Sequence, residues 1–299
     1  MMKEYFVGTD DFQRAHKVSA MISANALIRV KDGKIVARKT YVDADRWMLD
    51  SGAFSQVNKY GDFIMSPQDY VRLACKHQWC GRLACIVTQD YMCEPDVIKM
   101  LQDMGNKASV RIHQRKTVER YIQIMDEAEK YKLRVPVMPV LQGWEVEDYR
   151  DHLILYTRML SDLKYQRCGK LWKNPFLDTP HHHGHTGELL NTEQWIGIGS
   201  TCKRNKNPEI VSQILDQLSE AMGEFGFNKS RIHLFGYKQT GLKSSRVRDR
   251  IYSADSFAYD LADMKNGASR TRVSRIKSAT RFGERVRCMG VQSDLFDIK

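Results

Sequence analysis

Short apolar runs that each end in small or polar residues recur along the chain, and this feature constrains the fold more than any other. The seven runs are YFVGTD (5–10), WMLDSG (47–52), LACIVTQD (83–90), VPVMPVLQG (135–143), WIGIGS (195–200), IHLFGY (232–237) and IYSADS (251–256). Between most of them lie segments with the apolar periodicity of helices, at 67–78, 95–104, 117–131, 146–163 and 208–224. Strands that alternate with helices predict a parallel sheet, either open or closed into a barrel.

The residues at the carboxyl ends of the predicted strands favour a (β/α)8 barrel of the TIM type. They are Asp50, Asp90, Gln142, Gly199, Gly236 and Asp255. Barrel enzymes build their sites from the ends of many strands, whereas an open doubly wound sheet uses only those at its switch point. Seven strands are one short of eight, and we expect the eighth within 107–113 or 24–38. A length of 299 residues suits one α/β barrel domain over 1–299, with a basic extension over about 265–299.

Three aspartates, Asp50, Asp90 and Asp255, are the central candidates for chemistry. An Asp at a strand end commonly caps a helix or forms a turn, and each of the three taken alone has that interpretation. Together at one barrel mouth they favour catalysis, because crowded carboxyls raise at least one pKa and allow one to act as an acid while another stays ionised. Paired carboxylates are also the usual groups that cleave a glycosidic bond.

Small residues accompany these acids. In LDSGAFS (49–55) three small residues directly follow Asp50, which predicts either a turn or room for a ligand beside the acid. In GIGS (197–200) small residues would let the backbone approach a flat ligand. Gln142, in VLQGW, offers both a donor and an acceptor, so it either ties down a loop or reads the edge of a planar heterocycle.

Positive charge is concentrated toward the end of the sequence. Between residues 238 and 287 there are thirteen Lys and Arg against five Asp and Glu, so this stretch carries +8 of the net +11. A solvated basic face and a phosphate-binding surface both fit such a run, and the charge alone does not distinguish DNA from RNA.

The ordered motifs DSGAF, TQD, LQG, GIGS, HLFG and SADS resemble the tRNA-guanine transglycosylase superfamily, (β/α)8 barrels that exchange guanine for a 7-deazaguanine. The wording of MLDSGAFS, TQDYMCEP, GIGSTCKR, HLFGYK and SADSFAYD resembles in particular the phage and bacterial DpdA branch, which acts on DNA. The resemblance covers about residues 5–265. It implies a DNA-guanine transglycosylase that inserts a base such as preQ0, with tRNA as the alternative substrate for the same chemistry. The chain has no room for a separate RNA-recognition domain, which favours DNA.

The resemblance also implies roles for individual residues. Asp255 matches the nucleophile that attacks C1′ and leaves a covalent glycosyl-enzyme intermediate, and Asp50 matches the carboxyl that transfers protons to and from the bases. The residues implied to surround the base are Asp90 and Gln142 at its pyrimidine edge, Phe54 and Phe235 on its faces, and Gly197, Gly199, Ser200 and Gly236 along the lining. We predict phosphate contacts from Lys203, Arg204, Lys238, Lys243, Arg246, Arg248, Arg270, Arg272, Arg275 and Lys277.

A metal cofactor is not expected. The tRNA enzymes carry a C-x-C-x2-C zinc motif and a histidine after the nucleophile, whereas here only Cys288 follows Asp255. The cluster Cys75, His77, Cys80 and Cys85 is an alternative zinc site of non-standard spacing. The histidines His181, His182, His183 and His185 in the insertion DTPHHHGHTGEL (178–189) fit a solvated loop, a metal site or a contact to nucleic acid.

Two other classes of function remain open, a barrel that binds nucleic acid without activity and a base hydrolase that leaves an abasic site. The presence of both Asp50 and Asp255 argues against the inactive barrel. The sequence does not indicate the oligomeric state. It lacks an export signal and a long apolar run, and its seven irregularly spaced cysteines fit reduced thiols, so we expect a cytoplasmic protein.

Overall fold

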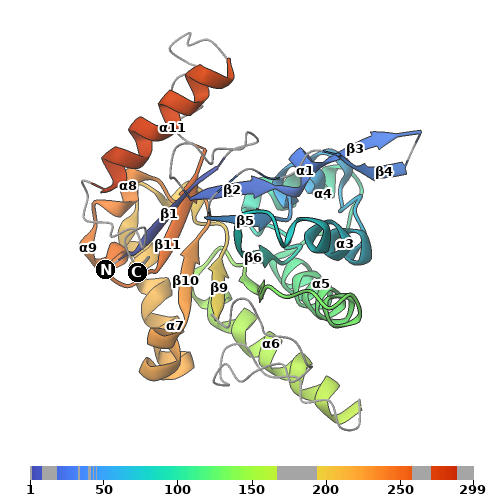
Figure 1. The fold of residues 1–299 in the computed structure, drawn as a ribbon. Coiled ribbons are helices and arrows are strands. Elements are labelled where there is room, and N and C mark those ends of the chain that lie inside the picture. Colours follow the sequence, from blue (N-terminus) through green and yellow to red (C-terminus); the bar gives the residue numbers. More distant parts are fainter. Residues whose placement is uncertain are drawn as a thin grey trace.

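A computed structural model describes residues 2–8, 19–32, 34–39, 42, 44, 46–166, 194–257 and 271–287. The main sheet is parallel, and its strands follow the order β7-β6-β5-β2-β1-β11-β10-β9-β8 (Figure 1). The strands are β1 (Glu4–Gly8), β2 (Ala20–Ser23), β5 (Arg46–Asp50), β6 (Arg82–Val87), β7 (Val137–Met138), β8 (Val140–Leu141), β9 (Trp195–Ile198), β10 (Arg231–Leu234) and β11 (Ser253–Ser256). All seven predicted strands are therefore present.

The two edges of this sheet are formed by one extended segment, residues 137–141. Its first half, β7, pairs with β6, and its second half, β8, pairs with β9. Pro139 lies between the halves and has no N–H to donate, but its carbonyl accepts a hydrogen bond of 2.9 Å from Gly197 N. The segment thus joins both edges and closes an eight-stranded barrel, which confirms the predicted fold class.

The eighth strand is β2, and both windows in which we expected it were wrong. Residues 28–37 form an antiparallel hairpin outside the barrel, β3 (Ile28–Lys31) with β4 (Lys34–Ala37). Residues from 110 onward begin a helix. The sequence of β2, AMIS, is too short to show a strand period, and it forms a strand because it pairs with β1 on one side and β5 on the other.

Helices surround the barrel, and their starts follow ordinary capping rules. They are α1 (Ala24–Leu27), α2 (Ala53–Tyr60), α3 (Pro67–His77), α4 (Pro95–Asp103), α5 (Val110–Lys130), α6 (Val146–Gln166), η2 (Cys202–Arg204), α7 (Pro208–Lys229), α8 (Gln239–Leu242), α9 (Ser245–Arg248) and α11 (Arg272–Arg287). Proline occupies the first turn of α3, α4 and α7, where its missing N–H has no cost. The helix α5 begins seven residues before the predicted start, because the Ser109 side chain caps it.

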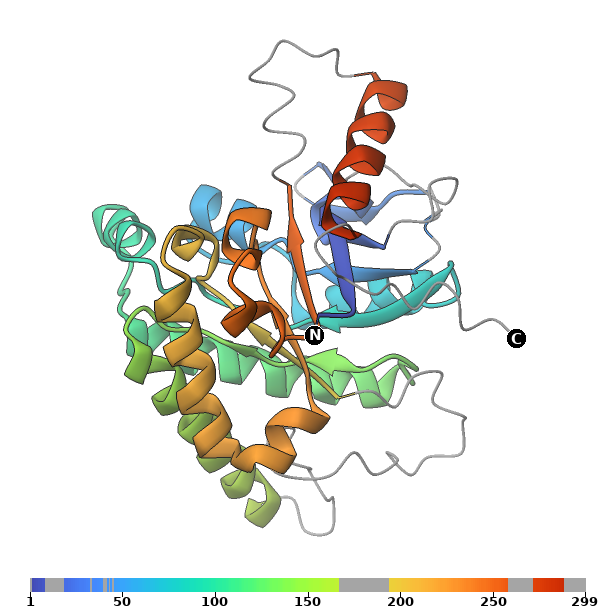
Figure 2. The same ribbon diagram turned by 90° about the vertical axis from the view of Figure 1, so that its left-hand side faces the viewer.

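Alternation along the strands builds two apolar layers. Inward-facing side chains such as Phe6, Met48 and Trp195 fill the barrel, while Tyr5 and Val7 pack outward under the helices. Phe282 of α11 joins the outer layer, with its ring centroid 5.5 Å from that of Tyr5. Figure 2 shows the amino-terminal end of α11 extending past the carboxyl end of β11. Among the described helices, none has the length and apolar character needed to cross a membrane.

Candidate active site

The predicted site residues gather at one end of the barrel. Asp50 ends β5 and Asp255 lies in β11, while Asp90, Gln142 and Ser200 follow β6, β8 and β9. Because all barrel strands are parallel, their carboxyl ends form a single mouth. The chain thus brings together at this mouth groups that are far apart in the sequence.

The two oxygens of the Asp255 carboxylate have different surroundings. Oδ1 accepts a hydrogen bond of 2.9 Å from Gly236 N and lies 3.2 Å from Nε2 of His233. Within the described part of the chain, Oδ2 has no hydrogen-bond partner. Gly236 has a φ of 64°, and a Cβ there would lie 2.6 Å from Cβ of Cys202, so glycine is needed to place this N–H. The arrangement orients the carboxylate and leaves one oxygen available to react.

His233 is a functional residue that the sequence analysis missed. Its side chain is fully buried, and its Nδ1 lies 2.8 Å from the Ser253 hydroxyl. In the tautomer whose Nε2–H donates to Asp255 Oδ1, Nδ1 accepts from the Ser253 hydroxyl. The alternation of side chains along a strand could have predicted this contact. His233 lies two residues before Phe235, and Ser253 lies two residues before Asp255, so the members of each pair point to the same, inward face.

Asp50 is a partly accessible carboxyl with a raised pKa. Burial raises that pKa from 3.8 to about 6, a hydrogen bond from Gly52 N opposes the rise, and the charge of Asp255 adds to it. The Gly52 N–H donates to Oδ2 at 3.0 Å. Gly52 has a φ of 79°, and a Cβ there would lie 2.5 Å from the Asn25 amide. The small residues after Asp50 therefore lead directly into α2, and Asn25 fills the space beside Gly52. Room for a ligand beside the Asp50 carboxyl stays a prediction.

Asp90 is buried next to Gln142. The pKa of Asp90 is raised to about 7, mainly by burial and also by the charge of Asp50, while a hydrogen bond from the Gln142 side chain opposes the rise. Gln142 Nε2 donates to Asp90 Oδ2. Two carboxyls that titrate near neutral pH in one mouth suit acid–base chemistry, because each exchanges protons readily there.

Gln142 is held by its surroundings on all sides. Its N–H donates to His152 Nδ1 at 2.8 Å, and its carbonyl accepts from Gln114 Nε2 at 2.8 Å. Burial lowers the pKa of His152 to about 3, so this ring stays neutral and Nδ1 remains an acceptor. A Cβ on Gly199 would lie 2.1 Å from the Gln142 amide, so only glycine leaves room for that side chain.

Glu94 is a second residue that the sequence analysis missed. It is 4% exposed, and its Oε2 lies 2.9 Å from the Ser200 hydroxyl, which is also 2.8 Å from Gln142 Oε1. The motif TQDYMCEP includes Glu94, but no local pattern separates it from an ordinary residue before a helix that starts with Pro95. Only the fold brings it beside Ser200, which is 106 residues away in sequence.

The two aromatic residues that we predict to contact the base, Phe54 and Phe235, follow β5 and β10, which lie on opposite sides of the barrel. Phe54 is in the first turn of α2 and is 66% exposed, a large exposure for an apolar ring. Phe235 follows β10 and packs on Gly197, where a Cβ would lie 2.5 Å from its ring. Its centroid is 4.7 Å from that of His233, with the rings at 77°. Their roles as stacking partners stay a prediction.

A protein family described as DpdA, DeoxyPurine in DNA protein A, matches residues 1–167, more than half of the chain. This chain belongs to the DpdA family. Membership makes it a transglycosylase that acts on DNA. The matched part contains Asp50, Asp90 and Gln142 but ends before Asp255, whose role therefore depends on the geometry described above. No curated protein matches the chain.

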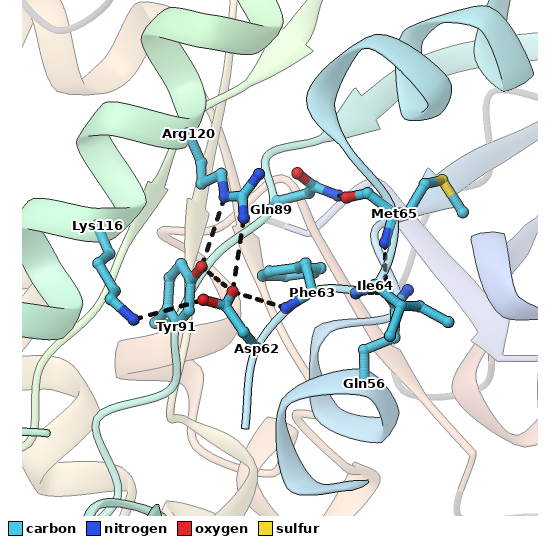
Figure 3. Close-up of polar contacts among 9 residues, drawn as sticks. All are labelled: Gln56, Asp62, Phe63, Ile64, Met65, Gln89, Tyr91, Lys116 and Arg120. Atoms are coloured by element: carbon cyan, nitrogen blue, oxygen red, sulfur yellow. Dashed lines mark hydrogen bonds and ion pairs between the residues drawn. The ribbon is translucent and has the colours of Figure 1, made fainter. Parts of the chain in front are cut away.

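In this DpdA-family protein, the loop that carries Asp90 is fastened by a clamp of four side chains, Asp62, Tyr91, Lys116 and Arg120 (Figure 3). The Tyr91 hydroxyl donates to Asp62 Oδ1, and Lys116 Nζ lies 3.6 Å from Oδ2. Burial alone would raise the pKa of Asp62, but the Tyr91 and Phe63 N–H hydrogen bonds and the two cations outweigh it and lower that pKa. Since Tyr91 directly follows Asp90, the clamp fixes the chain on one side of the Asp90 carboxyl.

We predict from these contacts that Asp62 acts as a positioning residue. We expect Asp62→Ala to raise the KM for the incoming base about three- to tenfold, because losing a hydrogen bond to a charged group costs about 1.5–3 kcal/mol and this site is partly exposed. Steady-state exchange at varied base concentration measures it. Asp103→Ala, at the end of α4, removes an exposed aspartate as the control. Equal KM values in both variants would rule out the positioning role.

The predicted phosphate contacts are placed unequally. Lys238, Lys243 and Lys277 are exposed, and Lys203 pairs with Asp96. Arg246 is exposed and pairs with Glu209 at 2.6 Å. The side chains of Arg270, Arg272 and Arg275 lie outside the described residues, as do His181, His182, His183 and His185.

Two of these arginines are poorly placed for phosphate. Arg204 is 7% exposed, lies 4.4 Å over the Trp144 ring and donates to the Trp144 carbonyl. The Arg248 carbonyl accepts from Met2 N, just before β1 begins, so Arg248 lies toward the opposite end of the barrel. Neither arginine is therefore expected to contact phosphate.

The cysteine and histidine cluster of 75–85 does not converge. Cys85 faces the interior of the barrel, whereas Cys75 and Cys80 pack in the outer layer with α3. Among the residues with a described placement, no group of three His, Cys, Asp or Glu side chains could hold a metal ion.

Proposed function

We propose that this DpdA-family protein exchanges guanine in DNA for a 7-deazaguanine such as preQ0 through a covalent glycosyl-aspartate intermediate. One observation carries the proposal. Asp255 has one carboxylate oxygen anchored by Gly236 N and His233, while the other has no hydrogen-bond partner among the described residues, and Asp255 shares the mouth with Asp50, whose pKa is raised to about 6. A nucleophile and a proton donor with separate environments are what base displacement at an anomeric carbon requires.

In the first step, Oδ2 of Asp255 attacks C1′ of the target nucleotide. The C1′–O bond forms as the C1′–N9 bond to guanine breaks, and the bonding electrons leave with the base. Asp50 in its protonated form donates a proton to the departing guanine, which leaves as a neutral molecule. Asp50 is then a carboxylate, and the sugar is attached to Asp255 with its configuration inverted.

In the second step, N9 of the incoming 7-deazaguanine attacks C1′ and the bond to Asp255 breaks. The Asp50 carboxylate accepts the N9 proton, so both carboxyls return to their starting states. Two inversions restore the original anomer. No redox reagent or external acid is required, because the proton given to the first base is recovered from the second.

Recognition of the base is assigned to the buried polar groups at the mouth. Asp90 and Gln142 would read the pyrimidine edge, and Phe54 and Phe235 would contact its faces. Guanine in a duplex hides both this edge and C1′, so the target base must be flipped out or unpaired. The exposed Lys238, Lys243 and Lys277 would hold flanking phosphates.

Labelled base and two nucleic acids test the proposal. The protein is incubated with labelled guanine or preQ0 and either DNA or tRNA, and we expect label in DNA. Label in tRNA alone would favour the alternative substrate, and abasic DNA without label would favour a hydrolase. No label and no abasic product in either nucleic acid would contradict the proposal.

A further inference from the structure

A groove between α5 and α6 has three arginines in its wall. Its volume is about 380 Å³, and Arg111, Arg115 and Arg158 line it together with Gln114, Asp151, Ile154 and Leu155. Arg111 and Arg115 are one turn apart on α5, and Asp151, Ile154 and Arg158 form a stripe on α6. Three cations against one carboxylate give the groove a net positive charge.

Among the described residues, few negative charges lie near the arginines of the groove. Arg115 lies 4.0 Å from Glu119, but both side chains are largely exposed and such a pair is weak. Among the described residues, Arg111 and Arg158 have no ion-pair partner. An anion in the groove would relieve the repulsion between the three guanidinium groups, whose planar forks suit phosphate oxygens.

The groove is linked directly to the base-reading residues. Gln114 forms part of its wall, and the same amide donates at 2.8 Å to the carbonyls of Gln142 and of Asp148. Both helices begin at the carboxyl ends of the strands, because α5 follows β6 and α4, and α6 follows β8. The groove therefore begins behind Gln142, on the mouth side of the barrel.

We propose that this groove binds the phosphate backbone of the DNA strand that enters the mouth. The inference rests on the proposed function, and it adds a contact surface on the α5–α6 side, separate from the basic residues after 238. A strand with its target base in the pocket must continue over the rim, and the groove places arginines where it would pass. A free phosphate shares the chemistry, but the continuity with Gln142 favours a backbone held together with the base.

The test compares two variants that each lose three positive charges. The groove variant is Arg111→Gln, Arg115→Gln and Arg158→Gln. The control is Lys3→Gln, Lys130→Gln and Lys132→Gln, three exposed lysines just before β1 and β7, at the opposite end of the barrel. Affinity for a 20-nucleotide single strand and for a trinucleotide is measured by fluorescence anisotropy over a range of salt concentrations.

We expect the groove variant to bind the long strand about 10- to 100-fold more weakly, with a slope of log K against log salt that is shallower by about 2–3. The control and the trinucleotide should show little change, since neither involves the groove. Equal losses for the trinucleotide and the long strand, or equal losses in the control, would overturn the inference. Wild-type affinity of the groove variant for the long strand would also overturn the inference. If the same sample still exchanged the base in DNA, the proposed function would be unaffected. A wild-type protein that binds no DNA would contradict both.

Discussion

Replacing Asp255 with asparagine is expected to lower the rate of base exchange on the order of 10⁴-fold or more, the scale of removing a nucleophile. Asparagine keeps an acceptor for Gly236 N, so the loop after β10 should hold its place. An amide oxygen is a poor nucleophile, so no covalent sugar–enzyme bond should form. Single-turnover exchange with labelled base, and mass spectrometry of protein quenched on DNA, measure both effects.

Asp255→Ala serves as a second variant. It leaves the Gly236 N–H and His233 without their acceptor, which we expect to cost about 1–3 kcal/mol in the free energy of unfolding. Both variants should be equally inactive although they differ in stability. Exchange by either variant at more than a hundredth of the wild-type rate would show that another group attacks C1′.

Asp50→Asn is expected to slow guanine release about 10²- to 10⁴-fold and to change its pH dependence. The raised pKa of Asp50, about 6, means that the acid form dominates below pH 6 and falls tenfold per unit above it. The wild-type rate of guanine release should therefore decline above pH 6, and the variant should lack this decline. Burst measurements of released guanine between pH 5 and 8 test this.

The same substitution has an effect on stability with a defined sign. A folded-state pKa of about 6 lies above the ordinary value of 3.8, so the folded protein retains a proton that the unfolded chain releases. The wild-type free energy of unfolding should fall between about pH 4 and 6, whereas the asparagine variant should escape this loss. At pH 8 the variant should be more stable by about 1–3 kcal/mol in denaturant melts. The raised pKa would be contradicted if the free energy of unfolding of the variant, minus that of wild type, were lower at pH 8 than at pH 4.

The sequence predicted the barrel because buried parallel strands read as apolar runs and end in polar residues at the mouth. The strand β2 was not predicted because its four residues resemble any short apolar segment. They form a strand only through pairing with the strands on both sides. The antiparallel hairpin at 28–37 has the strand character that we expected in that region, yet it lies outside the barrel. Pairing partners, which decide between these cases, are not encoded locally.

The candidate site was predicted where residues lie at strand ends, as for Asp50, Asp90, Gln142 and Asp255. His233 and Glu94 were missed because their roles depend on contacts between elements. The charge count along the sequence predicted phosphate contacts from both Arg248 and Lys238, although the two residues lie toward different ends of the barrel. The arginine groove could not be found from the sequence because its side chains come from residues 111–115 of one helix and 151–158 of another, more than thirty residues further along the chain.

The central claim is base exchange in DNA, and nucleoside analysis of cellular DNA tests it most directly. DNA is isolated from cells that express this protein and are supplied with a 7-deazaguanine precursor, and its nucleosides are separated and identified by mass spectrometry. We expect a 7-deazaguanine deoxynucleoside with the wild-type protein and none with Asp255→Ala. Unmodified DNA with the wild-type protein, or equal modification with both proteins, would contradict the account.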